Sequence, residues 1–156
     1  MVQIGWKEIG PEGGHAAGRQ LLQEMYTAQF GTDLPPIATT ALGKPYFVGS
    51  DVHFSISHTA RHVFCVLADC PVGLDAEEES RNIRLELAEK ILSPAEKALF
   101  DAAEDKRQTL LRFWVLKEAL VKRQGCGLQG YPNHTDFSPD DPRICGLQGC
   151  FVAVIT

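Results

Sequence analysis

Three observations predict a single α+β domain. Strand-like segments follow one another between residues 52 and 76. Two long helical patterns, residues 15–30 and 104–124, lie on either side of them. The chain has 156 residues, 44% hydrophobic and 22% charged, which is the length and composition of one globular domain. Neighbouring strands with separate helices are typical of the α+β class.

The chain opens with a predicted strand and a helix. Residues 2–6 alternate between apolar and polar or small side chains, as in a strand with one apolar face. Residues 15–30 carry apolar residues at helical spacing, and Gly31 ends the pattern. Residues 34–37 contain two prolines and are extended, and residues 42–47 read as a loop that leads into a strand.

The middle of the chain predicts a meander of three strands. Residues 52–57 alternate apolar and polar side chains. Residues 62–68 form an almost continuous apolar run, which indicates a strand in the centre of a sheet. Residues 72–76 form the third strand and run directly into a cluster of acidic residues.

Helices dominate the next part of the chain. Residues 83–92 have a helical pattern. The sequence Ser93-Pro94-Ala95-Glu96 contains the residues of a capping box with proline at the first helical position, so a short helix begins there and reaches about Phe100. The long helix over residues 104–124 then ends at a glycine.

The end of the chain suggests an internal repeat. Residues 129–149 contain prolines and little periodicity and are expected to be loop, and residues 151–155 form a closing strand. A helix that ends at glycine and is followed by a strand therefore occurs twice. We expect one domain, residues 1–156, made of two similar α+β halves related by a pseudo-two-fold axis, at about residues 1–70 and 71–156.

Composition excludes several classes of protein. The net charge of −5 argues against a general nucleic-acid binder. The chain has no apolar run long enough to span a membrane and no signal-peptide pattern at its start, so we expect a cytoplasmic protein without membrane contact. The five cysteines include no C-x-x-C pair, which indicates reduced packing thiols and argues against a zinc site.

Charged residues inside the long apolar helix are the first candidates for chemistry. Trp114, Glu118 and Lys122 form one stripe at i, i+4 and i+8, with Lys117 on a neighbouring flank. A salt bridge between Glu118 and Lys122 on a solvated seam is one interpretation. The alternative is that buried charges meet a metal or a charged ligand, because they must be paired.

Two acidic residues leave the third strand on the same side. Asp75 and Glu77 are two residues apart, so both side chains point to one face of the sheet. A solvated turn is the simpler interpretation of this acidic segment. Two such carboxylates are also suitable ligands for Mg²⁺, and Glu118 could supply a third.

Several further residues are suited to phosphate groups. Lys44 and His58 lie at strand margins, and Ser57 precedes the histidine. A purely structural role for the lone His58 is the alternative. With Lys117 and Lys122, these residues indicate metal-assisted phosphoryl or nucleotidyl transfer. The sequence contains no P-loop, no G-x-G-x-x-G and no catalytic triad with suitable spacing.

Four segments together resemble a known family. The sequences VGLDAE at residues 72–77 and FWVLKEALVK at residues 113–122 resemble the motifs G-[ILV]-D-x-E and W-x-x-K-E-A-x-x-K of the 4′-phosphopantetheinyl transferases. Gly43–Pro45 and Phe54–Thr59 resemble further motifs of the surfactin-synthetase-activating branch, and residues 125–128 resemble the G-x-G-L that follows its helix.

The resemblance implies an activity and its reactants. Members of this family bind coenzyme A and Mg²⁺ between two similar halves. A serine hydroxyl of an acyl or peptidyl carrier protein attacks the β-phosphate of coenzyme A. The phosphopantetheine arm moves to the serine, and 3′,5′-ADP leaves.

The resemblance also assigns roles to individual residues. The positions that match metal ligands are Asp75, Glu77 and Glu118. The positions that match catalytic residues are Glu118, which can deprotonate the serine, and Lys122. The positions that match coenzyme A contacts are Lys44 and Pro45 at the nucleotide end, Ser57 and His58 at a phosphate, and Lys117 and Lys122 near the diphosphate. Arg19 lies outside the matching segments and is a candidate for the 3′-phosphate.

Other interpretations remain open at this point. Members of this branch are usually longer at both ends, which leaves the role of Arg19 open, since it could instead pair with Glu24 or face water. The two predicted halves favour a monomer. The alternative function is that of a catalytically weak paralogue that binds coenzyme A or a nucleotide and serves an interaction role. A structural domain with coincidental motif matches is the third interpretation.

Overall fold

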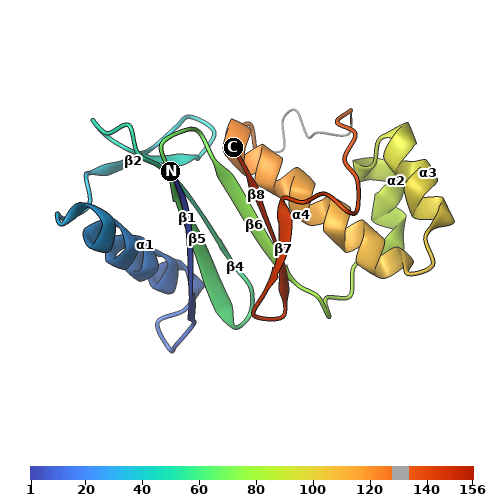
Figure 1. Cartoon of the computed structure of the whole chain (residues 1–156), viewed down its shortest axis with the longest axis horizontal. Helices are drawn as coiled ribbons and strands as arrows, with labels where there is room; N and C mark the ends of the chain where they lie inside the picture. Colours follow the sequence, from blue (N-terminus) through green and yellow to red (C-terminus); the bar gives the residue numbers. More distant parts are fainter. Residues whose placement is uncertain (128–133) are drawn as a thin grey trace.

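The structure, a computed structural model, describes residues 1–127 and 134–156 and has the predicted α+β character (Figure 1). The first elements are β1 (Val2–Glu8), α1 (Gly14–Phe30), β2 (Ile37–Thr39), β3 (Pro45–Phe47), β4 (His53–His58) and β5 (His62–Ala68). The later elements are β6 (Gly73–Glu78), a 3₁₀ turn (Leu85–Leu87), α2 (Ala88–Ile91), α3 (Pro94–Ala102), α4 (Lys106–Gln124), β7 (Ile144–Leu147) and β8 (Cys150–Ile155).

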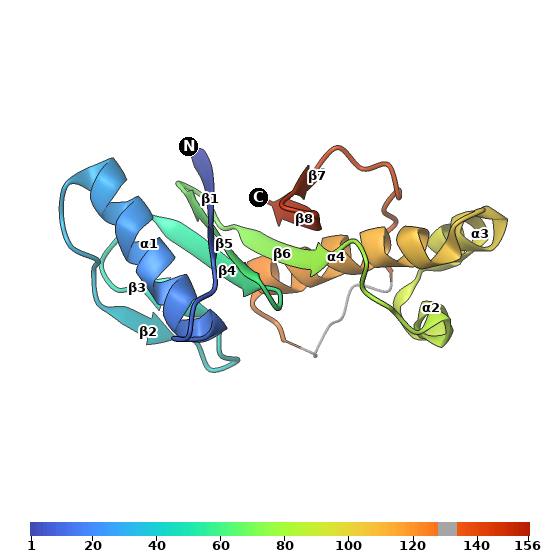
Figure 2. The ribbon, with the colours of Figure 1, turned by 90° about the horizontal axis from the view of Figure 1, so that it is seen from below.

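Two three-stranded antiparallel sheets form the centre of the molecule. The first has the order β1-β5-β4, so the apolar strand β5 is central, as predicted. The second has the order β6-β8-β7. Helix α1 packs on the first sheet and α4 on the second, and the two helices lie on opposite sides of the paired sheets (Figure 2). The two-fold relation between the halves stays a prediction.

The predicted meander is wrong for its third strand. Strand β6 follows β5 in the chain but pairs with β8 in the other sheet. Both edges of β5 are already occupied, by β1 on one side and β4 on the other, so a strand after β5 has no free edge beside it. The residues of β6 up to Ala76 are buried on both faces, which suits a position between a helix and a sheet.

Two other predictions need correction. The loop expected over residues 129–149 contains strand β7, which pairs with β8, while residues 128–133 lie outside the described residues. The helix expected over residues 83–92 is only a 3₁₀ turn and the short α2. The chain is fixed on both sides of this segment: Arg107 binds the carbonyls of Glu79 and Arg81 before it, and Ser93 is extended ahead of Pro94 after it.

The predicted capping box and the predicted glycine end of the long helix are confirmed, while that helix begins at Lys106, two residues later than expected. Ser93 and Glu96 form the complete capping box at the start of α3. The side chain of Asp105 caps α4, and Gly125 ends that helix in the left-handed conformation, with φ of 68°.

All five cysteines are free thiols, and burial raises the pKa of Cys65 to about 12. Among the described helices, none has the length and apolarity needed to cross a membrane.

Serine side chains join the two sheets where β4 lies beside β6. The hydroxyl of Ser55 accepts a hydrogen bond from the Leu74 amide at 3.0 Å, and that of Ser57 accepts one from the Ala76 amide at 3.3 Å. Both hydroxyls are buried. They take the place of backbone carbonyls, so β4 and β6 are held side by side although they belong to different sheets.

Strand β6 also approaches the backbone of α4 very closely. A Cβ atom on Gly73 would lie 1.9 Å from the carbonyl oxygen of Ala119 and 2.4 Å from the amide nitrogen of Arg123. Glycine is therefore required at this position, and it is the glycine of the motif at residues 72–77. The close approach brings the acidic end of β6 against one stripe of α4.

We expect Ser55→Ala and Ser57→Ala each to lower the free energy of unfolding by about 1–3 kcal/mol, because each leaves a buried amide of β6 without an acceptor. Urea denaturation followed by circular dichroism measures the change. Ser80→Ala is the matched control, since Ser80 is exposed and should change stability by less than about 0.5 kcal/mol. Equal stability of all three variants would show that the serine hydroxyls do not hold the two sheets together.

Candidate active site

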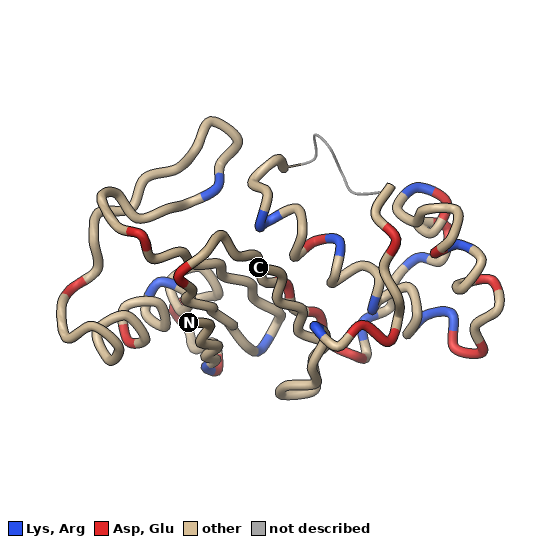
Figure 3. The backbone as a smooth tube through the Cα atoms, turned by 45° about the horizontal axis from the view of Figure 1, so that its top comes forward, with Lys and Arg blue, Asp and Glu red and all other residues tan. Residues whose placement is uncertain are grey.

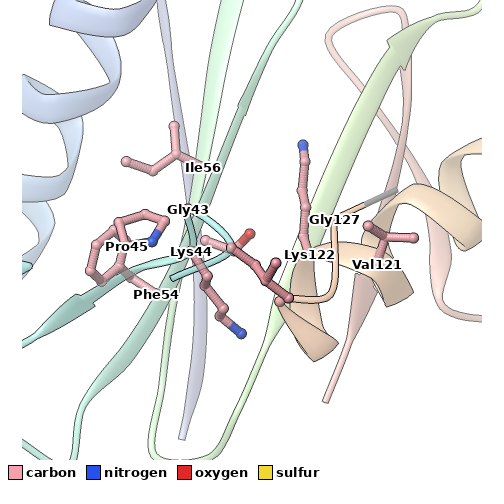
Figure 4. A pocket seen from close by; sticks show the side chains of 11 residues that line it. Gly43, Lys44, Pro45, Phe54, Ile56, Val121, Lys122 and Gly127 are labelled. Atoms are coloured by element: carbon pink, nitrogen blue, oxygen red, sulfur yellow. The ribbon is translucent and has the colours of Figure 1, made fainter. Parts of the chain in front are cut away.

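A pocket of about 250 Å³ lies where the first half of the chain meets the end of α4. Its walls bring together distant segments of the sequence (Figure 4). One wall comes from the turn before β3 and from β4, and the other from the last turn of α4 and the glycines after it. The residues that line it are Leu42, Gly43, Lys44, Pro45, Phe54, Ser55, Ile56, Val121, Lys122, Gly125 and Gly127. Three predicted site residues, Lys44, Pro45 and Lys122, are thus in one place.

Lys44 connects the two walls of this pocket. Its ammonium group donates a hydrogen bond to the carbonyl of Arg123 at 2.5 Å, so it binds a carbonyl at the C-terminal end of α4. Its aliphatic chain packs so tightly on Gly125 that a Cβ atom there would lie 2.9 Å from Cδ of Lys44. Burial lowers the pKa of Lys44, and the charge of Arg123 lowers it further. A lysine held in this way can lose its proton more easily than a solvated lysine.

Asp75 is the most buried acidic residue beside the pocket. Its Oδ1 atom accepts hydrogen bonds from Lys122 Nζ at 2.8 Å and from Ser57 Oγ at 3.1 Å. Its Oδ2 atom is buried and has no hydrogen-bond partner within the described part of the chain. Burial raises the pKa of Asp75, and the charge of Lys122 opposes that rise. An unpartnered buried carboxylate oxygen is costly unless a cation or a donor completes its environment.

Glu77 lies two residues further along β6 and faces the same stripe of α4. Its Oε1 atom accepts a hydrogen bond from Trp114 Nε1 at 3.0 Å and forms an ion pair with Arg81 at 2.5 Å. Burial raises the pKa of Glu77, the negative charge of Asp75 raises it further, and Arg81 opposes both effects. The two carboxylates are therefore close enough to repel each other, as their spacing on the strand predicts.

Helix α4 contacts the carboxylates on both sides of Glu118. Trp114 binds Glu77, and Lys122, eight residues later, binds Asp75. Glu118 lies midway between them on the same stripe, because residues four apart are on one face of a helix. The sequence also allowed a salt bridge between Glu118 and Lys122 on α4. In the described residues, Lys122 instead forms its ion pair with Asp75 of β6. The sequence predicted that the acidic end of β6 lies against this stripe of α4. The hydrogen bonds of Trp114 to Glu77 and of Lys122 to Asp75 place the two elements in contact.

The fit of these residues to a divalent cation rests on Asp75 and Glu77. Hard oxygen donors on adjacent positions of one face, one of them unpartnered, are suitable for Mg²⁺. In residues 1–127 and 134–156, no three or more His, Cys, Asp or Glu side chains are already grouped as a metal site. Lys122 and Arg81 form ion pairs with the two carboxylates. Figure 3 shows basic and acidic positions intermixed along the chain, most densely in the helices of the second half.

Two further residues predicted to contact coenzyme A, His58 and Arg19, lie near or on α1. The ring of His58 packs on the first turn of α1, where a Cβ atom on Gly14 would lie 2.6 Å from Nδ1. Gly13 precedes that helix and gives it no side-chain cap. Arg19 lies further along α1, and its alternative partner Glu24 is paired with Lys7 at 2.8 Å. Neither His58 nor Arg19 lines the pocket.

Lys117 has a different environment from the other predicted residues. Its side chain is completely buried and forms an ion pair with Glu96 at 2.6 Å, also completely buried. Burial lowers the pKa of Lys117, and the contact with Glu96 opposes this. The contact of Lys117 with a diphosphate stays a prediction. This placement does not favour it, because the ammonium group is already paired with the carboxylate of Glu96.

Sequence reasoning missed several residues of the site. Ser55 was read only as a polar position of a strand, although it lines the pocket and binds β6. Arg81 follows the acidic strand and was not considered. Its position four residues after Glu77 could have indicated the ion pair that the two residues form. Glu96 was explained by its capping box, so its second contact with Lys117 had no separate signal.

Comparison with known proteins identifies the family of the chain. The sequence model of the 4′-phosphopantetheinyl transferase superfamily matches residues 71–149, which include β6, α4 and most of the second half. This covers slightly more than half of the chain, and the chain therefore belongs to that superfamily.

Individual relatives carry the same family name. The chain is 33% identical over 116 residues to the 4′-phosphopantetheinyl transferase Sfp of Bacillus subtilis (strain 168), covering 71% of this chain and 51% of that protein. It is 34% identical over 88 residues to the 4′-phosphopantetheinyl transferase gsp of Aneurinibacillus migulanus, covering 55% of this chain and 36% of that protein. The chain thus spans about half the length, or less, of these curated relatives.

Proposed function

We propose that this chain transfers the 4′-phosphopantetheine arm of coenzyme A to a serine of an acyl or peptidyl carrier protein, in a reaction that needs Mg²⁺ and releases 3′,5′-ADP. The observation that carries the proposal is the pocket beside Asp75, in which Lys44 and Pro45 from one half face Lys122 from the other. Membership of the superfamily supports the class of reaction.

The pocket would take one end of coenzyme A. A volume of about 250 Å³ is smaller than a site that encloses a whole cofactor of this size. Apolar side chains, among them Phe54, Ile56 and Val121, line most of it, which suits a flat base more than a phosphate. The nucleotide end would therefore lie in the pocket, and the diphosphate would extend along α4 toward Asp75.

The residues near Asp75 would hold the reacting groups. Lys122 would contact the diphosphate, since its side chain is 32% exposed and its present partner is a single carboxylate oxygen. Asp75 and Glu77, with Glu118 from the facing stripe of α4, would hold Mg²⁺. When bound, the metal ion stabilises negative charge on the diphosphate oxygens.

The chemical step needs one proton acceptor and no nucleophile from this chain. The serine oxygen of the carrier protein forms a bond to the β-phosphorus, the bond from that phosphorus to the leaving 3′,5′-ADP breaks, and the serine proton passes to a base. Glu118 is the proposed base, because it lies on the stripe that faces the carboxylates of β6. This agrees with the lack of a catalytic triad in the sequence.

Incubation with coenzyme A, Mg²⁺ and a panel of apo carrier proteins, followed by mass spectrometry, tests the proposal. We expect a gain of about 340 Da on at least one carrier protein, which is the mass of the transferred arm. The same carrier with its acceptor serine replaced by alanine is the control and should show no gain. EDTA should abolish the transfer and excess Mg²⁺ should restore it.

Two results would contradict the proposal in different ways. Binding of coenzyme A without any mass gain on the panel would favour the catalytically weak paralogue. Transfer that continues at full rate in EDTA would show that Asp75 and Glu77 do not act through a divalent cation.

We expect Glu118→Gln to keep the fold and to lower kcat by about a hundredfold or more, because the amide can neither accept the serine proton nor hold the metal ion well. Steady-state transfer assays and circular dichroism measure the two effects. Glu104→Gln replaces an exposed acid just before α4 and should keep the wild-type kcat. A Glu118→Gln protein with wild-type kcat would remove this residue from the mechanism.

A further inference from the structure

The second half of the chain contains a completely buried ion pair away from the pocket. Lys117 Nζ lies 2.6 Å from Glu96 Oε1, and both side chains have no exposed surface. The pair joins the first turn of α3 to the middle of α4. Neither residue lines the pocket or contacts the acidic end of β6 in the described contacts.

Glu96 uses both carboxylate oxygens. Oε1 accepts a hydrogen bond from the Ser93 amide at 2.8 Å as part of the capping box, in addition to the contact with Lys117. Oε2 accepts a hydrogen bond from the Phe137 amide at 3.0 Å. The carboxylate is therefore a common acceptor for the start of α3, the middle of α4 and the chain that follows α4.

Lys117 binds the same returning segment. Its ammonium group donates a hydrogen bond to the carbonyl of Thr135 at 3.3 Å and lies 5.7 Å from the centre of the Phe137 ring. Residues 135–137 are thus held by both members of the pair. The same connection leaves α4 at the glycines that line the pocket.

A buried pair of this kind specifies geometry more than it adds stability. Removing two charges from water costs about as much as their attraction returns, so a neutral pair of similar volume is often equally stable. Lys117 is adjacent to Glu118 and lies about 100° around the helix axis from it. A constraint on Lys117 therefore fixes the rotation and the axial position of the stripe that faces β6.

We infer that Glu96 and Lys117 are positioning residues for the proposed transfer reaction: the pair orients α4, and with it Glu118 and Lys122, without contacting coenzyme A. The inference rests on the proposed function. It assigns to Lys117 a role different from the diphosphate contact that the sequence motif suggests, and it adds Glu96, which lies outside the four motif segments.

A double-mutant cycle separates the two roles of Lys117. The variants are Glu96→Gln, Lys117→Met and the double variant, compared with wild type by transfer kinetics at a temperature well below every melting point. Lys117→Met should lower kcat/KM for coenzyme A by on the order of tenfold or more, because it leaves the buried carboxylate of Glu96 with its amide donors but without a positive charge beside it. The double variant should return to within about threefold of wild type, since both members are then neutral.

A matched control comes from the exposed side of α3. Lys97→Met removes a lysine that pairs with Glu89 and Asp101 and should leave kcat/KM unchanged. Melting temperatures are recorded for every variant. Wild-type kinetic constants in Lys117→Met with only a lowered melting temperature would show a merely structural role and overturn the inference.

The remaining outcomes are also distinct. A double variant no more active than Lys117→Met alone, together with a fully active Glu96→Gln, would show that Lys117 itself contacts the substrate, and would overturn the inference while leaving the proposed function intact. Failure of the wild-type protein to transfer the arm to any carrier protein would overturn the proposed function, and the inference with it.

Discussion

The contact between β4 and β6 is the constraint on which the rest of the structure depends. Strand β5 has no free edge, so β6 cannot pair with it and belongs to the second sheet, and the buried hydroxyls of Ser55 and Ser57 join β4 to β6 in place of a backbone ladder. Ser57 uses its own proton to bind Asp75, so the same side chain both joins the sheets and orients the most buried acid of the site. The pocket exists because this contact brings the loop and strand of the first half against the end of α4.

Helix α4 connects the pocket to the remainder of the second half through different flanks. One flank carries Trp114 and Lys122, which bind the carboxylates of β6. A neighbouring flank carries Lys117, which is bound by Glu96. The helix end is fixed by Lys44, which comes from the first half of the chain. Through side chains and one backbone carbonyl, the helix is therefore in contact with three different parts of the fold, and a small rotation of α4 would disturb all of these contacts together.

Local patterns predicted the elements better than their pairing. The long helices and their glycine ends followed from apolar periodicity, and the capping box at Ser93 followed from residue type and spacing. The position of β6 could not be predicted, because it depends on β1 occupying the edge of β5 from the other end of the chain. The residues around Lys44 and Lys122 were expected near one another from the family motifs, whereas Glu96 already had a local explanation and its contact with Lys117 arises only in the folded chain.

The central claim is that coenzyme A binds between the two halves, in the pocket beside Asp75. Titration of ¹⁵N-labelled protein with coenzyme A, followed by amide chemical shifts, tests this most directly. The claim predicts that the largest shifts occur on both walls at once, at Lys44 and Ser55 on one side and at Gly125 and Gly127 on the other. Shifts confined to a single half, or centred on the separate hollow between Leu99, Arg112 and Asp140, would contradict it.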